Sequence, residues 1–331
     1  MRTTVAAAHR RRRVAALTVL AILIAGGVAL AAGAGGNSRR AASSGRTSQS
    51  TGAASDSAAR APTQGPPPPP VAHLIVAPVH TAGAWRVVAR VHGLPGAWVA
   101  EQAGVTLMRF DQARVHLNLH AGSSDGGTVG WRYGDAVTPR EIHLLVAAFN
   151  GGFKLTYPNV GFTSGGHVAA ALKSGLGSIV TYTDGTTAIG AWHAGVPSAR
   201  RTVYSVLQNQ YLLIDRGRPS PSAAGCILGC FGATVGSRTV VARSGLGITE
   251  SGQLVWAAGN SLTPTGLARA MIAAGAVRAV ELDINPDWVA AYLYPHHRGG
   301  PLPVPVIPGQ RGIGGALLAP YSRDFFTVVA D

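Results

Sequence analysis

The chain has 331 residues, a formal net charge of +14 and two cysteines. The charge is uneven, because residues 1–70 contain nine arginines and one acid, Asp56, so that they carry +8 and the remaining residues carry +6. The basic residues of that remainder are scattered and form no stripe with aromatic side chains, which argues against nucleic acid as a partner. A mildly basic surface suits an anionic polymer or a phosphorylated substrate.

The N-terminus has the layout of an export signal, because a basic segment, 1–13, precedes an uncharged apolar run, 14–33. About 20 helical residues can cross a hydrocarbon core of roughly 30 Å, so we predict that 14–33 anchors the chain in the cell membrane. The arginines before the run place the N-terminus inside and the remainder outside. The alternative is a secreted protein whose signal peptide is cleaved near Ala31.

Residues 34–70 consist mainly of Ser, Gly, Ala, Thr and Pro and lack aromatic residues, so we predict a disordered tether. Residues 71–331 have the size of one domain. Within it, strands are expected at 85–91, 105–110, 115–119, 178–182, 187–189, 211–214, 239–241 and 254–257, and helices at 138–145 and 264–274.

Both helices have start signals. Thr138, with Glu141 three residues later, forms a capping box ahead of the first helix. Thr263 is a suitable N-cap for the second helix, Pro264 lies in its first turn, and Gly275 ends it.

The second helix joins two apolar runs, 254–257 and 277–284. A strand, helix, strand unit places its strands parallel, and polar residues collect where the second strand ends. Glu281, Asp283 and Asn285 would then share one face, because side chains alternate along a strand. This strand end is the predicted location of the chemistry.

Two carboxyl groups so close together fit hydrolysis of a glycosidic bond, in which one donates a proton or holds charge and another attacks or activates water. Asp283 could take either role, with Glu281 as its partner. The alternative is structural: these carboxylates pair with arginines such as Arg243 and hold two strands together.

No metal site or cofactor is expected, although a divalent cation remains open. Asp283, Asn285 and Asp287 resemble the start of a calcium loop that then lacks its glycine and its final glutamate. His116 and His120 share a strand face, but without a third ligand we predict that this is the solvent face of a half-buried strand.

Two glycine-containing segments can approach a ligand closely. In the first, Asn150 precedes Gly151 and Gly152, which indicates a tight turn beside a free amide, although a plain turn explains the glycines equally well. In the second, Arg243 adjoins a flexible stretch and could clamp a phosphate.

Cys226 and Cys230 lie in a loop-like stretch. In an oxidising compartment a short disulfide is expected, since a zinc site would need two further ligands nearby.

Taken in order, these segments resemble the phosphodiester glycosidase family. The matching residues are Asn150 to Phe153, Arg243 to Gly247, and Leu282-Asp283. One departure is the glycine-rich turn expected after the aspartate, which here is 284–288. The chain looks like a divergent bacterial branch, in which Gln208-Asn209 and Asp283-Ile284-Asn285-Pro286 would replace the usual elements.

The resemblance implies an α+β fold with a strand-rich mixed-sheet core and flanking helices, as a single domain behind the transmembrane segment. It also implies an enzyme that hydrolyses a sugar-1-phosphodiester, or a related glycosidic bond, in an extracytoplasmic glycan or phosphorylated wall polymer. The implied site comprises Asp283 and Glu281 as catalytic carboxyls, with Asn150, Gly151, Gly152, Arg243, Asn209 and Asn285 binding substrate. The alternative is a non-catalytic domain that binds cell-wall glycan on an exposed Trp288 or Tyr292.

Overall fold

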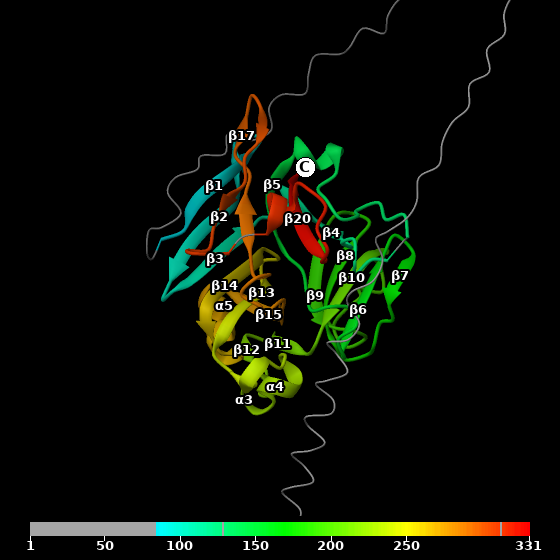
Figure 1. Ribbon diagram of the computed structural model, residues 1–331, viewed down its shortest axis with the longest axis vertical. Coiled ribbons are helices and arrows are strands. Elements are labelled where there is room, and N and C mark those ends of the chain that lie inside the picture. The colour runs from blue at the N-terminus through cyan, green and yellow to red at the C-terminus, as the bar shows by residue number, and fades with distance from the viewer. Residues whose placement is uncertain (1–83, 128, 312) are drawn as a thin grey trace, which may run out of the picture. The chain divides into compact units, whose positions relative to one another are not determined.

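The computed structural model in Figure 1 describes residues 84–331 except 128 and 312. The predicted basic segment, anchor and tether (1–13, 14–33 and 34–70) lie outside the described residues. Within the described range, no helix is both long and apolar enough to cross a membrane. That range is strand-rich, with four sheets and few helices, as the sequence predicts.

The largest sheet has eight strands. In spatial order these are β1 (Arg86–Val91), β2 (Leu94–Gln102), β3 (Val105–Phe110), β14 (Leu254–Leu262), β13 (Val241–Thr249), β15 (Ala276–Glu281), β11 (Leu212–Asp215) and β12 (Arg218–Pro219). Strand β13 is antiparallel to both β14 and β15, so these two run parallel to each other with β13 between them. The predicted parallel orientation is therefore confirmed, although the strands do not pair directly.

Helix α5 (Pro264–Ala273) connects β14 to β15 and lies against the eight-stranded sheet (Figure 1). Thr263 caps it, because its hydroxyl accepts a hydrogen bond from Gly266 N at 3.0 Å. Leu267 and Met271 are fully buried in a cluster with side chains of the sheet. Gly275, with φ of +93°, follows the helix in the left-handed conformation that glycine accepts most readily. The predicted helix is confirmed within one residue.

The second sheet has five strands, in the order β19 (Val304–Pro305), β16 (Ala291–Leu293), β5 (Leu145–Asn150), β20 (Phe325–Ala330) and β4 (Val115–His120). Helix α2 (Pro139–Ile142) precedes β5 and has the predicted capping box of Thr138 and Glu141. This helix is a single turn, shorter than predicted, because Leu145 already begins a strand whose six residues are all buried.

The third sheet contains β7 (His167–Ala170), β6 (Val160–Ser164), β10 (Val203–Asn209), β8 (Gly177–Tyr182) and β9 (Thr187–Ala191). A small hairpin of β17 (His296–His297) and β18 (Gly300–Pro301) completes the sheets. The remaining elements are α3 (Pro221–Gly225), α4 (Ile227–Cys230), η1 (Val235–Ser237) and η2 (Gly314–Leu317). A disulfide joins Cys226 to Cys230, between α3 and the end of α4.

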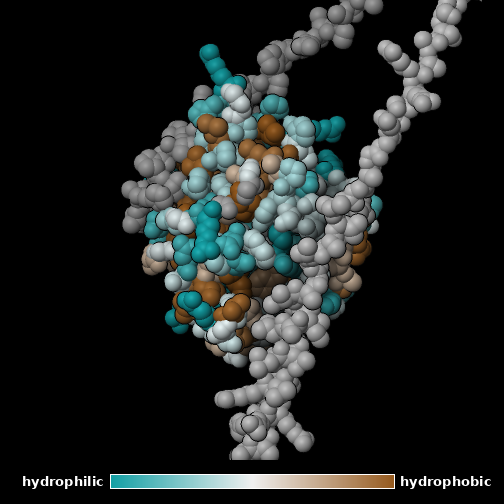
Figure 2. All heavy atoms as spheres, in the orientation of Figure 1, coloured by the Kyte–Doolittle hydropathy of each residue, from teal (hydrophilic) through white to brown (hydrophobic). Residues whose placement is uncertain are grey.

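All ladders between the described strands are antiparallel, so the core is not mixed in the sense predicted. One hydrophobic cluster receives side chains from the three large sheets. At its centre, the Phe149 ring centroid lies 5.6 Å from that of Phe326 and 5.9 Å from that of Trp256. The face shown in Figure 2 carries hydrophobic residues in several separate patches among hydrophilic ones.

Candidate functional site

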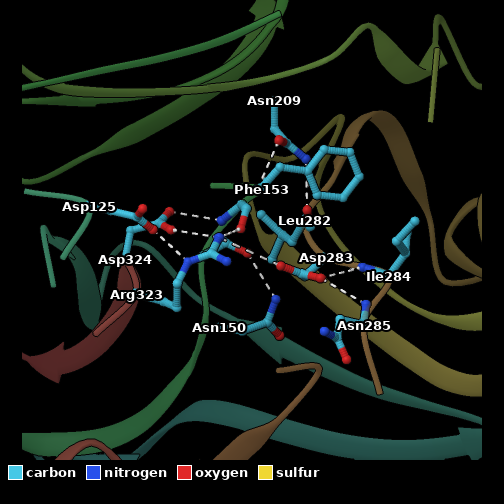
Figure 3. A network of polar contacts seen from close by, with 12 residues as sticks. Asp125, Asn150, Phe153, Asn209, Leu282, Asp283, Ile284, Asn285, Arg323 and Asp324 are labelled. Atoms are coloured by element: carbon cyan, nitrogen blue, oxygen red, sulfur yellow. Dashed lines mark hydrogen bonds and ion pairs between the residues drawn. The ribbon is translucent and has the colours of Figure 1, made fainter. Parts of the chain in front are cut away.

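The last residues of β5 and β10 meet the segment that follows β15 (Figure 3). Asn209, which ends β10, donates through Nδ2 to the carbonyl oxygens of Glu281 and Leu282, each at 2.7 Å. Its Oδ1 accepts a hydrogen bond from Phe153 N at 3.0 Å. One buried side chain thus joins the loop after β5 to the end of β15.

Asn150 has a similar structural task. Its Nδ2 donates to Ser244 Oγ at 3.0 Å, and this hydroxyl oxygen accepts from Asp283 N at 3.2 Å. Asn150 Oδ1 accepts from Ala290 N at 3.3 Å. Asn150 and Asn209 are both buried, and their partners are protein groups. These two amides therefore join segments of the protein to one another, and this differs from the predicted role of orienting substrate.

Asp283 lies in a tight turn just after β15 and lines a cavity of about 270 Å³. Its Oδ1 accepts hydrogen bonds from Ile284 N at 2.7 Å and Asn285 N at 2.8 Å. Its Oδ2 receives none from the described residues and lies 3.8 Å from Arg323 Nη2. Oδ1 is thus committed to the turn, and Oδ2 is the oxygen available to a ligand.

The electrostatic environment of Asp283 suits proton transfer. Burial raises the pKa of Asp283 to about 7, against the opposing effects of its backbone hydrogen bonds and of Arg323. A carboxyl group with this pKa exchanges protons near neutral pH. The predicted strand face is wrong in detail, because β15 ends at Glu281 and the chain turns at Asp283.

The walls of this cavity are aromatic and basic. Phe153, Tyr157 and Trp288 line it, together with Lys154, whose Nζ lies 5.1 Å from the Trp288 ring centroid. Trp288 is half-buried, whereas Tyr292 is buried and accepts a hydrogen bond from Ile313 N at 2.7 Å. Trp288 therefore has the exposure that a sugar platform needs, and Tyr292 does not.

The sequence did not single out Arg323, although it is central to the network. Its Nε donates to Asp125 Oδ2 at 2.5 Å and its Nη2 to the Gly152 carbonyl oxygen at 2.8 Å. Trp288 covers the guanidinium, with 4.3 Å between Cζ and the ring centroid. Arg323 thereby joins the cavity wall to the turn after Asn150.

Asp324 was also missed. Its Oδ2 accepts a hydrogen bond from Gly152 N at 2.8 Å, and its Oδ1 lies 3.8 Å from Arg323 Nη2. Burial raises the pKa of Asp324 to about 6, and Arg323 opposes that rise. The available signal was the Arg-Asp pair directly before the apolar run 325–330.

Glu281 and Arg243 form a buried ion pair, with 2.8 Å between Oε2 and Nη1 and no exposed surface on either side chain. Arg243 also donates to three backbone carbonyl oxygens, those of Leu262, Phe231 and Thr239. Burial raises the pKa of Glu281, and Arg243 opposes that rise. A phosphate clamp and a catalytic carboxyl must both reach the ligand, so these two predicted roles do not fit. The structural alternative, an ion pair between two strands, is what is observed.

The glycines after Asn150 admit protein groups to close contact. A Cβ on Gly151 would overlap the Asp324 carboxylate, and a Cβ on Gly152 would crowd the Asn209 amide, with 3.1 Å to its Oδ1. The network itself therefore requires glycine at Gly151 and leaves little room for a side chain at Gly152.

The two histidines of β4 have separate partners. His116 Nδ1 lies 2.7 Å from Asp331 Oδ1, while His120 is fully buried with Nε2 3.1 Å from Glu141 Oε1. The predicted solvent face is thus wrong for His120. Among residues 84–331, apart from 128 and 312, no group of three or more His, Cys, Asp or Glu side chains is arranged to hold a metal ion.

No protein-family model and no curated protein matches the chain. A similar solved structure is the catalytic domain of zebrafish N-acetylglucosamine-1-phosphodiester alpha-N-acetylglucosaminidase, auto-inhibited by its pro-peptide. The two chains are 15% identical, and the TM-score is 0.44. The similarity covers 71% of this chain and 78% of that chain. Another is a hypothetical protein from Synechocystis, with 12% identity, coverages of 76% and 64% and a TM-score of 0.39. A third, from Burkholderia pseudomallei and described as exported, has 11% identity, coverages of 71% and 75% and a TM-score of 0.34. Structural similarities with identities and TM-scores this low give no basis for assigning a function to this chain.

Proposed function

We propose that the chain hydrolyses a sugar-1-phosphodiester, or a related glycosidic bond, in an extracytoplasmic glycan or wall polymer. The observation that carries this proposal is the Asp283 carboxyl, which lines a cavity and has one oxygen fixed by two backbone N–H groups. Its other oxygen receives no hydrogen bond from the described residues and lies 3.8 Å from the Arg323 guanidinium. The order of the sequence motifs that resemble the phosphodiester glycosidases supports the choice of substrate class.

One carboxyl is enough for this reaction. A phosphate that leaves from a sugar C1 is a stable anion, so the departing oxygen needs little help from an acid. Asp283 Oδ2 then acts as a general base, for which a pKa near the working pH is best. It takes a proton from water as the water oxygen bonds to C1 and the C1–O electron pair passes to the phosphate. The products are the free sugar and a phosphomonoester, and attack from the opposite face inverts C1.

The cavity walls would supply the binding. A half-buried indole offers an apolar face for the C–H groups of a sugar ring, as Trp288 does here. The Lys154 ammonium in the same cavity can oppose the charge that grows on the leaving phosphate. These two side chains would orient the sugar and its phosphate over Asp283.

A second function, glycan binding without catalysis, is favoured by one observation. Glycosidases of the usual kind present two carboxyl groups to the bond. Here Asp283 lines the cavity, whereas Glu281 is held in its pair with Arg243. A binding domain would use the same aromatic walls and would not need a second carboxyl.

The test is an assay of free sugar from the methyl ester of N-acetylglucosamine 1-phosphate, using the full-length chain and Asp283→Asn, with and without a chelator. Turnover that the substitution abolishes supports the hydrolase, and loss with chelator adds a divalent cation. Binding of wall glycan without turnover on a panel of sugar-1-phosphodiesters would replace the hydrolase with the binding domain.

A further inference from the structure

A second hollow adjoins the cavity of Asp283. Its volume is about 490 Å³, and it shares Ala233, Ile284 and Asn285 with the smaller cavity. Because three residues belong to both linings, the two hollows lie side by side along the turn after Asp283, and we call the pair the groove. Together they fall within the roughly 300–1,000 Å³ that sites for small ligands occupy, so the groove has room beyond a single sugar ring.

The charges along this groove have one sign apart from Asp283. Lys154 lines the smaller hollow and Arg238 the larger, and both side chains are exposed. Neither cation forms an ion pair with another of the described residues. A groove with a free cation in each part favours a ligand with an anion at each position.

The two hollows differ in what they can do to a ligand. The smaller one holds Asp283, the carboxyl argued above to act on the bond. The larger one has no acidic residue in its lining and offers polar groups such as Asn260 and Ser261 beside Arg238. The larger hollow can therefore bind a chain but cannot perform the proposed reaction on it.

We propose that the substrate is an anionic polymer whose leaving-group side continues through this groove. The phosphate of the bond that is cleaved lies near Lys154, and the next phosphate along the chain is bound by Arg238. This inference rests on the proposed hydrolysis and specifies its substrate as a chain with repeated phosphodiesters instead of a single terminal one.

The experiment compares two substrates on the full-length chain. One is the methyl ester of N-acetylglucosamine 1-phosphate, which has one phosphate, and the other is an oligomer of N-acetylglucosamine 1-phosphate units joined by phosphodiesters. The variants are Arg238→Gln and Val235→Glu, which adds a negative charge to the same lining at a side chain that is 98% exposed. Arg216→Gln is the matched control, because Arg216 is exposed and lines neither hollow.

Arg238→Gln should raise KM for the oligomer about fivefold to tenfold, with kcat unchanged, because one charge-assisted contact is lost. Val235→Glu should raise that KM as well, and neither variant should alter KM for the methyl ester. At about 1 M salt, where the Debye length is roughly 3 Å, the difference between wild type and Arg238→Gln should disappear.

This inference is overturned if both substrates are turned over and KM for the oligomer is the same in Arg238→Gln and Arg216→Gln. The proposed hydrolysis would still stand in that case. If wild type cleaves neither substrate, the hydrolase itself fails. Calorimetry of Asp283→Asn with the oligomer then tests whether the groove binds the chain. An affinity that falls with Arg238→Gln and with added salt supports binding in the groove. Equal affinity with and without Arg238→Gln, or no binding at all, contradicts it.

Discussion

The Asp324 carboxylate lies against Gly151 so closely that any side chain at Gly151 would overlap it. The Gly151 N–H donates to the Asp324 carbonyl oxygen at 2.9 Å, and the Gly152 N–H donates to the carboxylate at 2.8 Å. The turn after β5 is therefore built around an acid that precedes β20. This contact joins two neighbouring strands of the second sheet, β5 and β20, where the candidate site begins.

Gly151→Ala should destabilise the domain, because a methyl group would force apart backbone and carboxylate in a packed interior. Overpacking of this kind costs about 1–3 kcal/mol, and separating a buried carboxylate from its donor adds to that cost. Thermal unfolding should show Tm lower by roughly 2–4 °C for each kcal/mol lost. Gly225→Ala in α3 is the control, since a Cβ there meets nothing within 4 Å. Equal Tm values for the two variants would contradict the close contact.

Asp283→Asn should abolish turnover and keep the fold. The Asn Oδ1 can still accept from Ile284 N and Asn285 N, so the turn is preserved, whereas the amide cannot take a proton from water. Loss of a general base typically lowers kcat about 10²-fold to 10⁴-fold. Asp287→Asn, in the same loop but exposed and paired with Arg311, should retain wild-type kcat. Similar losses in both variants would point to the loop instead of the carboxyl.

The pH dependence of kcat should follow the same carboxyl. Since the base must be deprotonated, activity should rise with pH through the pKa of Asp283, at about 7. A profile that instead falls through this range would assign Asp283 as a general acid, with the proton delivered to the leaving oxygen. Activity measured between pH 5 and 9 at saturating substrate separates the two.

Stability should change with pH in the opposite direction. Burial raises the folded-state pKa values of Asp283 and Asp324, to about 7 and about 6, above the ordinary value of 3.8. Between pH 4 and 7 the folded chain thus binds more protons than the unfolded chain, so the free energy of unfolding is highest near pH 4 and falls as pH rises. Asp283→Asn should reduce this decrease in the free energy of unfolding between pH 4 and 7, by at most about 4 kcal/mol. Denaturant unfolding of wild type and Asp283→Asn at pH 4, 5.5 and 7 measures the decrease. The same pH dependence of the free energy of unfolding in both proteins would contradict the raised pKa.

Glu281→Gln should act on folding more than on catalysis. It leaves the fully buried Arg243 charge without a counter-ion, and breaking a buried pair in this way costs about 3–5 kcal/mol. The control is Asp215→Asn, which removes a partially exposed partner of Arg278 and should cost less than about 1 kcal/mol. Urea unfolding compares the two. An unchanged unfolding free energy with kcat lost in Glu281→Gln would restore Glu281 as a catalytic candidate.

Local signals predicted the parts of the fold that depend on a few neighbouring residues. Helix α5 follows from Thr263, Pro264 and Gly275, because a cap, a first-turn proline and a left-handed glycine act within one or two turns. Strand β5 was missed, since a short run buried on both faces reads the same as a buried helix.

Local signals also predicted one part of the candidate site and missed the rest. Asp283 ends an apolar run with other polar residues, and that pattern is local. Arg323 and Asp324 meet Gly152 across more than 170 residues of chain, which only the pairing of β20 with β5 brings together. Arg243 looked free beside its glycines, and its burial against Glu281 depends on the register of β13 with β15. Such pairings are not visible in one sequence.

The place of β20 between β5 and β4 has a consequence for biosynthesis. The strand and the two charged residues before it are synthesised more than 170 residues after β4 and β5, with which they pair. Until 322–330 have emerged, β4 and β5 lack the strand that joins them, and the turn at Gly151 lacks the acid that fills it. A chain that has not yet emerged beyond residue 322 therefore cannot assemble the cavity, and the proposed activity would arise only after β20 has been synthesised.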